Sequence, residues 1–462
     1  MLLSMLRLAK ILILILFTNT AYAKCNFSTS DFLYQLGIPK NIKSIEIETP
    51  KSSKYYKNFL KIIRSKSDNI NPKLKISFKS KIIVNYDFGK CTYNGSVRQL
   101  GDWKDHIQLE NGIPIRSLKV SIENGNILNA VKFKLLIPST RGDLNEVLGA
   151  MLIRELGFIA PETFQVQTII NNFQSQMLFQ EDTRKELLER NKKREGPIFE
   201  GDESLLWSYK NFQNQDLEPL SLSRVKNEKW FLKGENSQII TLDAYSQLQK
   251  AYLNYSNEIG KNRDKFIIQT IDQKIKKFND YFMILLAMNG THGLRPHNRQ
   301  YYYNIFTQML EPIYYDGNLN LNAKIDLDNT DLDLVRANEI NKKLQDKINL
   351  LKENKSVFAK FDQRVLINQK EALSFYKNSL KSISINLSEI TKKLTNVEAS
   401  VSKKKTFEGL LNKYLNSESL YKINQVIFTQ FEYSNQNYLG KTLQNKQIKL
   451  SPLQVSEIIS RI

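Results

Sequence analysis

The residues best suited to chemistry lie in the stretch Gly290–Gly317, which reads G-T-H-G-L-R-P-H-N-R-Q-Y-Y-Y-N-I-F-T-Q-M-L-E-P-I-Y-Y-D-G. Asn298 comes first, and Asp316 follows after a run of aromatic residues. Amide and carboxylate oxygens are ligands that Mg²⁺ or Mn²⁺ accepts while it also binds the phosphates of ATP. The spacing therefore predicts a metal site made by Asn298 and Asp316. A plainer alternative is a tyrosine-rich β-hairpin that closes in an Asp-Gly turn and binds nothing.

A predicted strand and the helix after it would supply a cation for the phosphates. Residues 131–137 alternate, so that Lys132 and Lys134 share one face of the strand. The helix begins with a capping box, Asp143 to Glu146, and ends at Gly157.

Glu155 lies on the apolar stripe of that helix, where a carboxylate needs a nearby cation. A strand lysine paired with a helix glutamate holds ATP phosphates in kinases, so Lys134 and Glu155 are predicted to pair. Two alternatives stay open: Glu146 is a competing partner, and Glu155 can lie on a solvent-exposed last turn.

Two strands, 164–170 and 173–179, are predicted to form a hairpin around an Asn-Asn turn. In a kinase arrangement, the second strand leads to the hinge that contacts adenine through backbone groups. Gln180, Glu181 and Asp182 are the predicted hinge. Strands are also predicted at 42–47, 74–78 and 82–86, and helices at 262–286, 340–354 and 365–394 before a polar, coil-like tail.

Six blocks carry a resemblance: V-R-Q-L-G-D-W-K-D-H-I (Val97–Ile107), K-F-K-L-L-I-P-S-T-R-G-D-L-N-E (Lys132–Glu146), R-E-L-G-F-I-A-P-E-T (Arg154–Thr163), M-L-F-Q-E (Met177–Glu181), T-R-K-E-L-L-E (Thr183–Glu189), and H-N-R-Q-Y-Y-Y with E-P-I-Y-Y-D-G. In this order the chain resembles the CotH kinase-like family, named after spore-coat proteins. The blocks span about residues 91–320, and their order is more specific than any one of them.

The resemblance implies an α+β, bilobal, atypical protein-kinase-like fold. Its expected parts are a small α+β domain at 24–90, an N-lobe at 91–203, a C-lobe with the metal loops at 204–330 and a helical C-terminal part at 331–462. The implied nucleotide-binding residues are Arg98, Lys104, His106, Lys134, Glu146, Glu155 and Glu181. The implied cofactors are ATP and Mg²⁺ or Mn²⁺, with the metal held by Asn298 and Asp316.

The loop before Asn298 departs from the family. Where active members have a catalytic Asp, this chain has Gly293, flanked by Thr291 and His292. Either His292 replaces the Asp as the base, which imidazole can do near neutral pH, or phosphoryl transfer is weak or absent.

The N-terminus reads as a secretory signal: basic residues, an apolar run at Ile11–Phe17, and a cleavage site after Ala23. No other segment is long and apolar enough for a membrane helix, so an exported protein, periplasmic or extracellular, without a transmembrane anchor is expected. Cys25 and Cys91, the two cysteines of the chain, are then expected to form a disulfide.

The formal net charge is +20, and about +18 without the signal, which favours anionic partners. Nucleic acid is not expected, because no motif for it is present. The favoured hypothesis is an exported kinase that phosphorylates Ser or Thr of an envelope or secreted protein. The second is a binding module for an anionic envelope polymer. The third is a hydrolase that uses Asp102, Asp105 and His106. The oligomeric state is left open.

Overall fold

A computed structural model describes residues 24–66, 68–110, 113–202, 222–258, 275–295, 298–326, 341–396, 428–434, 437–442 and 446–451. The chain divides into two compact units. Unit 1 comprises Met1–Val147, Pro161–Glu186 and Phe358–Ala372, and unit 2 comprises Leu148–Ala160, Leu187–Val357 and Leu373–Ile462. The predicted signal peptide, residues 1–23, lies outside the described residues. Within the described ranges, every helix is too short or too polar to span a bilayer.

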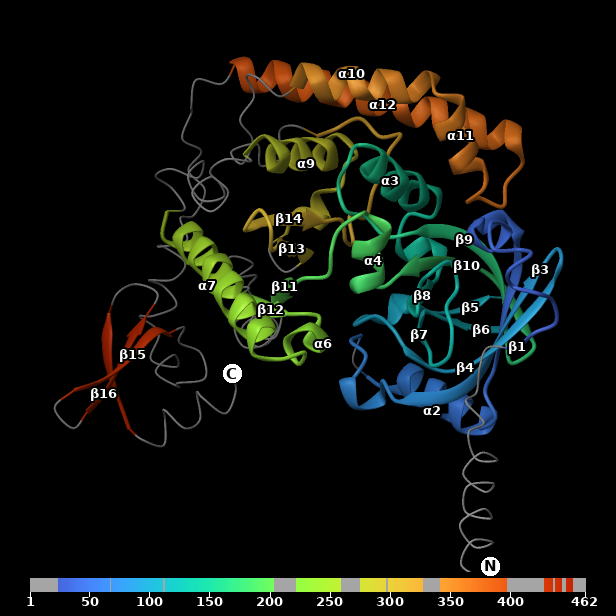
Figure 1. The fold of residues 1–462 in the computed structure, drawn as a ribbon, viewed down its shortest axis with the longest axis horizontal. Coiled ribbons are helices and arrows are strands. Elements are labelled where there is room, and N and C mark those ends of the chain that lie inside the picture. Colours follow the sequence, from blue (N-terminus) through green and yellow to red (C-terminus); the bar gives the residue numbers. More distant parts are fainter. Residues whose placement is uncertain are drawn as a thin grey trace, which may run out of the picture. The chain divides into compact units, whose positions relative to one another are not determined.

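Unit 1 is built on a sheet whose seven strands close into a ring, drawn in blue to green in Figure 1. The strands are β2 (Ile42–Glu48), β3 (Ser77–Tyr86), β4 (Gly89–Gln99), β7 (Leu118–Ile122), β8 (Lys132–Leu136), β9 (Thr163–Ile170) and β10 (Phe173–Glu181). Their order is β4-β3-β2-β9-β10-β8-β7, and β7 pairs back onto β4. Strands β2 and β9 run parallel, whereas the other neighbours run antiparallel. Closure satisfies the backbone groups that would otherwise form two free edges.

The predicted β9–β10 hairpin is confirmed. Asn171 and Asn172 form its turn with φ values of 46° and 75°. Two consecutive left-handed residues give the twist that a two-residue hairpin needs, and asparagine tolerates this conformation better than most residues. The turn is fixed to the end of β2, because Asn171 N donates to Ile47 O (2.9 Å) and Asn171 Oδ1 accepts from Thr49 N (2.8 Å).

A short strand and a helix complete this part of unit 1. Strand β1 (Lys24–Cys25) pairs with β4, which places Cys25 opposite Cys91. The predicted disulfide between them is confirmed, with an S–S distance of 2.02 Å. Helix α2 (Ser52–Arg64) buries its apolar face, and β5 (Ile107–Glu110) pairs with β6 (Ile113–Arg116).

One apolar cluster serves the strands of the ring. Phe179 of β10 stacks on Phe133 of β8, with ring centroids 4.4 Å apart, and on Phe164 of β9, 4.6 Å apart. All three side chains are fully buried. Their alternating positions on neighbouring strands place them on one face of the sheet.

Unit 2 contains a four-stranded antiparallel sheet of order β12-β11-β13-β14. These strands are β11 (Ile198–Asp202), β12 (Leu222–Val225), β13 (Gln300–Asn304) and β14 (Met309–Ile313). Helices α6 (Glu228–Phe231), α7 (Glu235–Glu258) and α9 (Ile275–Ala287) fall between β12 and β13 in the chain. Helix α3 (Leu144–Glu155) starts in unit 1 and continues into unit 2, and α4 (Lys185–Arg190) crosses the next boundary.

The C-terminal half of unit 2 has two long helices and a small sheet. Helix α10 (Asn341–Glu353) lies beside α12 (Gln369–Asn396), and the Tyr376 hydroxyl donates to Leu351 O at 2.5 Å (Figure 1). Helix α11 (Lys355–Asp362) lies between them in the chain. After α12 come β15 (Phe428–Ser434), β16 (Asn437–Thr442) and β17 (Gln447–Leu450), an antiparallel sheet where a coil-like tail was predicted.

The predicted bilobal kinase-like fold with a helical C-terminal part is wrong. A closed seven-stranded ring stands in place of the expected N-lobe, and strands follow the C-terminal helices. The physical reason is long-range pairing. Alternation within β2, β4, β7 and β9 predicts strands, but it does not say that β2 pairs with β9 or β7 with β4.

Candidate functional site

The candidate site in unit 2 is formed by the loop after α9 and the turn after β14. Asn289 ends α9 in a left-handed conformation, with φ 56°. Its side-chain amide donates to Asn320 O (3.0 Å) and Ala323 O (2.9 Å). On the other side, Tyr314 N donates to Ile159 O at 2.8 Å. The Asn289 bonds join the end of α9 to the chain that follows the turn, and the Tyr314 bond joins the end of β14 to the segment after α3.

Three predicted residues meet where the segments join. Asn298 Nδ2 donates to the carbonyl oxygen of His292 at 3.0 Å, and Asn298 is almost fully buried. His292 Nε2 lies 3.8 Å from Asp316 Oδ2. The side chain of His292 is 37% exposed and that of Asp316 is 13% exposed, so both reach solvent. The structure therefore brings His292, Asn298 and Asp316 together, and their catalytic and metal-binding roles stay predictions.

Close packing explains the glycine at the position of the expected catalytic Asp. A Cβ added at Gly293 would lie 3.0 Å from Tyr315 O and 3.2 Å from Gly317 Cα. Both contacts are with backbone, which does not move aside easily. A side chain at position 293 would thus push the loop away from the turn that carries Asp316, so glycine is the residue that fits at this position.

The turn itself has an unusual backbone. Asp316 has a φ of 47°, in the left-handed region that costs most residues free energy. Lys226 lies beside it, with Nζ 5.1 Å from the centre of the Tyr315 ring and 2.6 Å from Glu200 Oε2. Arg224 Nε contacts the other oxygen of Glu200 at 3.2 Å.

Glu200 is consequently ionised more easily than usual. Burial alone would raise its pKa, but Lys226 and then Arg224 outweigh burial, so that the pKa is lowered from the ordinary 4.5. This ion cluster ties β11 and β12 to the residue before Asp316. Sequence reasoning missed it, because neither Glu200 nor Lys226 belongs to a motif.

The donor atoms fit a divalent cation that also binds phosphate. The bond from Asn298 Nδ2 to the loop leaves its Oδ1 as the end that can face a ligand, and Asp316 adds a carboxylate. Mg²⁺ is usually held by one or two protein oxygens, and substrate phosphates and water fill the other positions. Among the described residues, no three His, Cys, Asp or Glu side chains form a metal-binding group.

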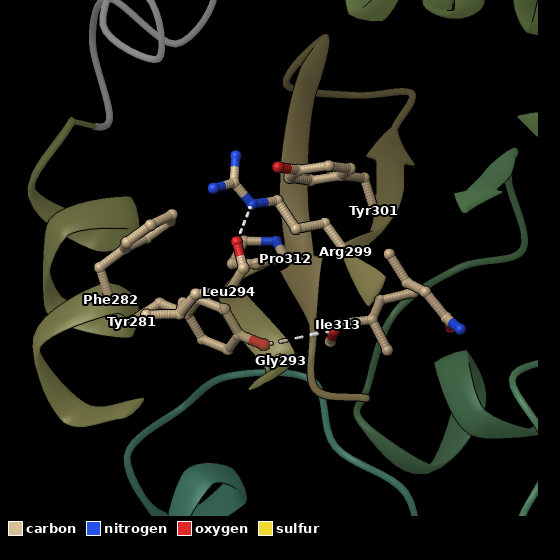
Figure 2. A pocket seen from close by; sticks show the side chains of 9 residues that line it. Tyr281, Phe282, Gly293, Leu294, Arg299, Tyr301, Pro312 and Ile313 are labelled. Atoms are coloured by element: carbon tan, nitrogen blue, oxygen red, sulfur yellow. Dashed lines mark hydrogen bonds between the residues drawn. The ribbon is translucent and has the colours of Figure 1, made fainter. Parts of the chain in front are cut away.

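A small cavity lies next to the loop (Figure 2). Its volume of about 10 Å³ is room for a single water molecule. Arg299 Nε donates across it to Leu294 O at 2.7 Å, and the Tyr281 hydroxyl reaches Ile313 O at 3.4 Å. The first bond closes the loop on itself and the second joins α9 to β14; the cavity is too small for a nucleotide.

The predicted nucleotide residues of unit 1 have a different setting. Lys134 is buried in β8, opposite Gln180 of β10 and Lys119 of β7. Glu146 is also fully buried, and its Oε1 accepts from Gln180 Nε2 at 2.7 Å. The buried carboxylate of α3 is therefore that of Glu146, and its pairing with Lys134 stays a prediction.

The prediction that Glu155 lies on the buried face of α3 is wrong. Glu155 is exposed in the last turn of the helix. Its charge acts on Tyr376: burial raises the pKa of Tyr376, and the negative charge of Glu155 raises it further. The helix ends at Gly157 as predicted. The Asp143 carboxylate accepts from Gln165 Nε2 at 2.7 Å, and the Glu146 carboxylate accepts from Gln180 Nε2 at 2.7 Å; the capping box between Asp143 and Glu146 stays a prediction.

The predicted hinge uses its backbone donors within the protein. Glu181 N donates to Glu162 O (2.9 Å) and Asp182 N donates to Lys132 O (3.0 Å). Glu181 is buried, and its Oε2 accepts from Glu162 N at 3.2 Å. Those two N–H groups are therefore engaged, and adenine would have to be recognised by other groups.

The residues expected to cover the phosphates have structural contacts. Arg98 is exposed on β4. Lys104 Nζ donates to Ile63 O (3.2 Å) and Ser65 O (2.6 Å), carbonyls at the end of α2. His106 is buried, with Nδ1 2.9 Å from Ser117 Oγ.

The hydrolase hypothesis loses its support from this geometry. Its proposed residues Asp102 and Asp105 are exposed, and Asp102 pairs with Lys75, whereas His106 is buried. An acid/base pair needs both groups within reach of one substrate.

No protein-family model matches the chain, and no curated protein is similar to it. The resemblance to the CotH kinase-like family accordingly stays a prediction.

Proposed function

We propose that this protein is an exported, metal-dependent phosphotransferase that takes the γ-phosphoryl group of ATP and passes it to a hydroxyl group. One observation carries the proposal: His292, Asn298 and Asp316, from two separate segments of unit 2, lie together at a partly exposed position. An amide and a carboxylate can hold the metal ion, and an imidazole can act as the general base.

Each residue has a definite task in this proposal. Asp316 and Asn298 Oδ1 would hold Mg²⁺ or Mn²⁺, which supplies charge neutralisation at the phosphate oxygens. His292 Nε2 would accept the proton from the hydroxyl of a Ser or Thr acceptor. The bond from Asn298 Nδ2 to His292 O fixes the backbone that carries this base.

The test measures nucleotide binding and then transfer. With ATP and Mn²⁺ added, the wild-type melting temperature is expected to rise by roughly 2–4 °C, and Asp316→Asn should abolish most of the rise. Asp346→Asn, an exposed carboxylate on α10, is the matched control and should respond like the wild type.

Transfer is tested with labelled ATP and a mixture of acceptor proteins. Incorporation that disappears in Asp316→Asn and in His292→Ala supports the proposal. A well-folded wild-type protein that neither responds to ATP with Mn²⁺ nor transfers label would refute it.

A second function is favoured by the packing at Gly293. Because the loop has no room for the usual catalytic Asp, the protein could serve as a binding module for anionic envelope polymers through its charge of +20. Retention on a phosphate-rich resin that is lost at moderate salt and is unchanged in Asp316→Asn, together with absent transfer, would favour this function.

A further inference from the structure

Arg116, at the end of β6 in unit 1, is a buried cation with an unusual environment. Its residue is 2% exposed, and it is among the largest fully buried side chains described. The guanidinium Cζ lies 3.6 Å from the centre of the Tyr55 ring, and Nη1 lies 3.5 Å from Asn58 Oδ1. Among the described residues, Nε and Nη2 have no hydrogen-bond partner. A buried charge normally has a carboxylate partner, so this one needs an explanation.

Two more polar groups near Arg116 are also buried with unused hydrogen-bonding capacity. The Tyr56 hydroxyl and Asn171 Nδ2 are both buried, and neither has a partner within 3.5 Å among the described residues. The ring centroids of Tyr56 and Tyr55 lie 5.4 Å apart and Arg116 Cζ stacks on Tyr55, so Tyr56 and the guanidinium are neighbours. Burial raises the pKa of Tyr56 and Tyr55 raises it further, whereas a longer hydrogen-bonding interaction with the Asn171 side chain and the charge of Arg116 lower it. Tyr56 also packs its ring on Phe173, next to the hairpin turn.

Arg116, Tyr56 and Asn171 together offer mainly hydrogen-bond donors. Guanidinium and amide N–H groups only donate hydrogen bonds, and a phenol hydroxyl can donate one. The Asn171 acceptor, Oδ1, is already used by Thr49 N. The cluster therefore offers several donors and a positive charge, and the complementary partner is an anion.

The edge of the Arg116 guanidinium that carries Nε and Nη2 indicates which kind of anion fits. Nη1 faces Asn58, so the remaining donors are Nε and Nη2, which point the same way from the planar group. This edge binds two oxygen atoms of one carboxylate or phosphate side by side. A monatomic anion would use only part of it.

We propose that Arg116, Tyr56 and Asn171 form a binding site for an oxyanion, the phosphate or carboxylate group of a small ligand. The site lies in unit 1 and involves none of the residues of the proposed phosphotransferase centre. Binding there would join α2, β6 and the β9–β10 turn through one charged group, and so stabilise unit 1.

The test follows the melting temperature of the full chain in inorganic phosphate, in acetate, and in sodium chloride of equal ionic strength. Wild type is expected to gain roughly 2–4 °C in phosphate or acetate over chloride. Arg116→Met should lose this gain. Arg64→Met, an exposed arginine at the end of α2, should keep it. The phosphate and acetate arms distinguish the two kinds of oxyanion.

A second variant tests the proposal independently, in case Arg116→Met does not fold. Asn171→Asp keeps the left-handed turn and the acceptor for Thr49 N, and it places a carboxylate oxygen where Nδ2 was. This internal oxyanion should raise the melting temperature in chloride and remove the response to added phosphate or acetate. Asn172→Asp, the other turn residue, should do neither. An oxyanion response absent from wild type, or preserved in both Arg116→Met and Asn171→Asp, would overturn the proposal.

Discussion

At the scale of single residues, the environment of each polar side chain matters more than its type. Lys104, Lys134 and His106 are three of the residues predicted to bind the nucleotide. Lys104 binds the last carbonyls of α2, Lys134 is buried in the sheet, and His106 faces Ser117. Polar groups taken out of water are held by the nearest partner, whatever function a motif suggests.

Glu200 supplies a residue-scale prediction about pH. Its pKa is lowered in the folded protein, so the folded state favours the carboxylate more than the unfolded chain does. The ion pair therefore stabilises above the ordinary pKa of 4.5, and the stabilisation is lost as the pH falls through the lowered folded pKa. Glu200→Gln should cost roughly 1–2 kcal/mol at pH 7 and progressively less in acid.

Urea unfolding at several pH values measures this difference. Glu228→Gln, a glutamate exposed at the start of α6, is the control and should change stability little at any pH. A Glu200→Gln deficit that is the same at pH 7 and pH 3 would show that the charge is not the cause.

At the scale of elements, the ends of helices were easier to predict than their faces. Helix α3 stops with Phe158 N donating to Ile153 O (3.1 Å) and Gly157 N donating to Arg154 O (2.8 Å). This pair of bonds requires a left-handed residue, and Gly157 has a φ of 89°. A local signal, one glycine after an apolar stripe, was enough to find it.

Gly157→Ala tests this termination without steric interference. A Cβ at position 157 would meet no atom within 4 Å, so any loss of stability comes from the backbone conformation alone. We expect a loss of about 1–2 kcal/mol in thermal or urea unfolding. Gly37→Ala has equally open space and no positive φ, and it should be neutral or slightly stabilising. Equal effects of the two substitutions would contradict the backbone explanation.

At the scale of the whole molecule, the disulfide acts on one unit. Cys25 and Cys91 are 66 residues apart, and the loop that they close lies wholly within unit 1. Constraining a loop of this length stabilises by about 4 kcal/mol on the chain-entropy estimate. Reduction should therefore lower the unfolding transition of unit 1 and leave that of unit 2 in place.

Calorimetry with and without a reducing agent measures this effect. The Cys25→Ser, Cys91→Ser double variant should melt like the reduced protein and show no response to the reductant, because the chain has no other cysteine. A reductant effect on both units, or on neither, would be inconsistent with a constraint confined to unit 1.

The sequence by itself determined the features that depend on neighbours along the chain. The hairpin turn at Asn171 and Asn172, the end of α3 at Gly157, and the pairing of the two cysteines followed from local chemistry or from simple counting. The approach of His292, Asn298 and Asp316 also followed from spacing, because a short hairpin returns the chain to its starting point.

The tertiary structure alone decided which distant strands pair and which side chains become buried. The parallel contact of β2 with β9, and the closure of β7 onto β4, join strands that no local pattern connects. The closed ring stands in place of the expected N-lobe, Gln180 of β10 binds the buried Glu146 while Glu155 stays exposed, and Arg116 is buried against Tyr55. Burial depends on packing between segments far apart in the chain, so periodicity within one segment cannot predict it.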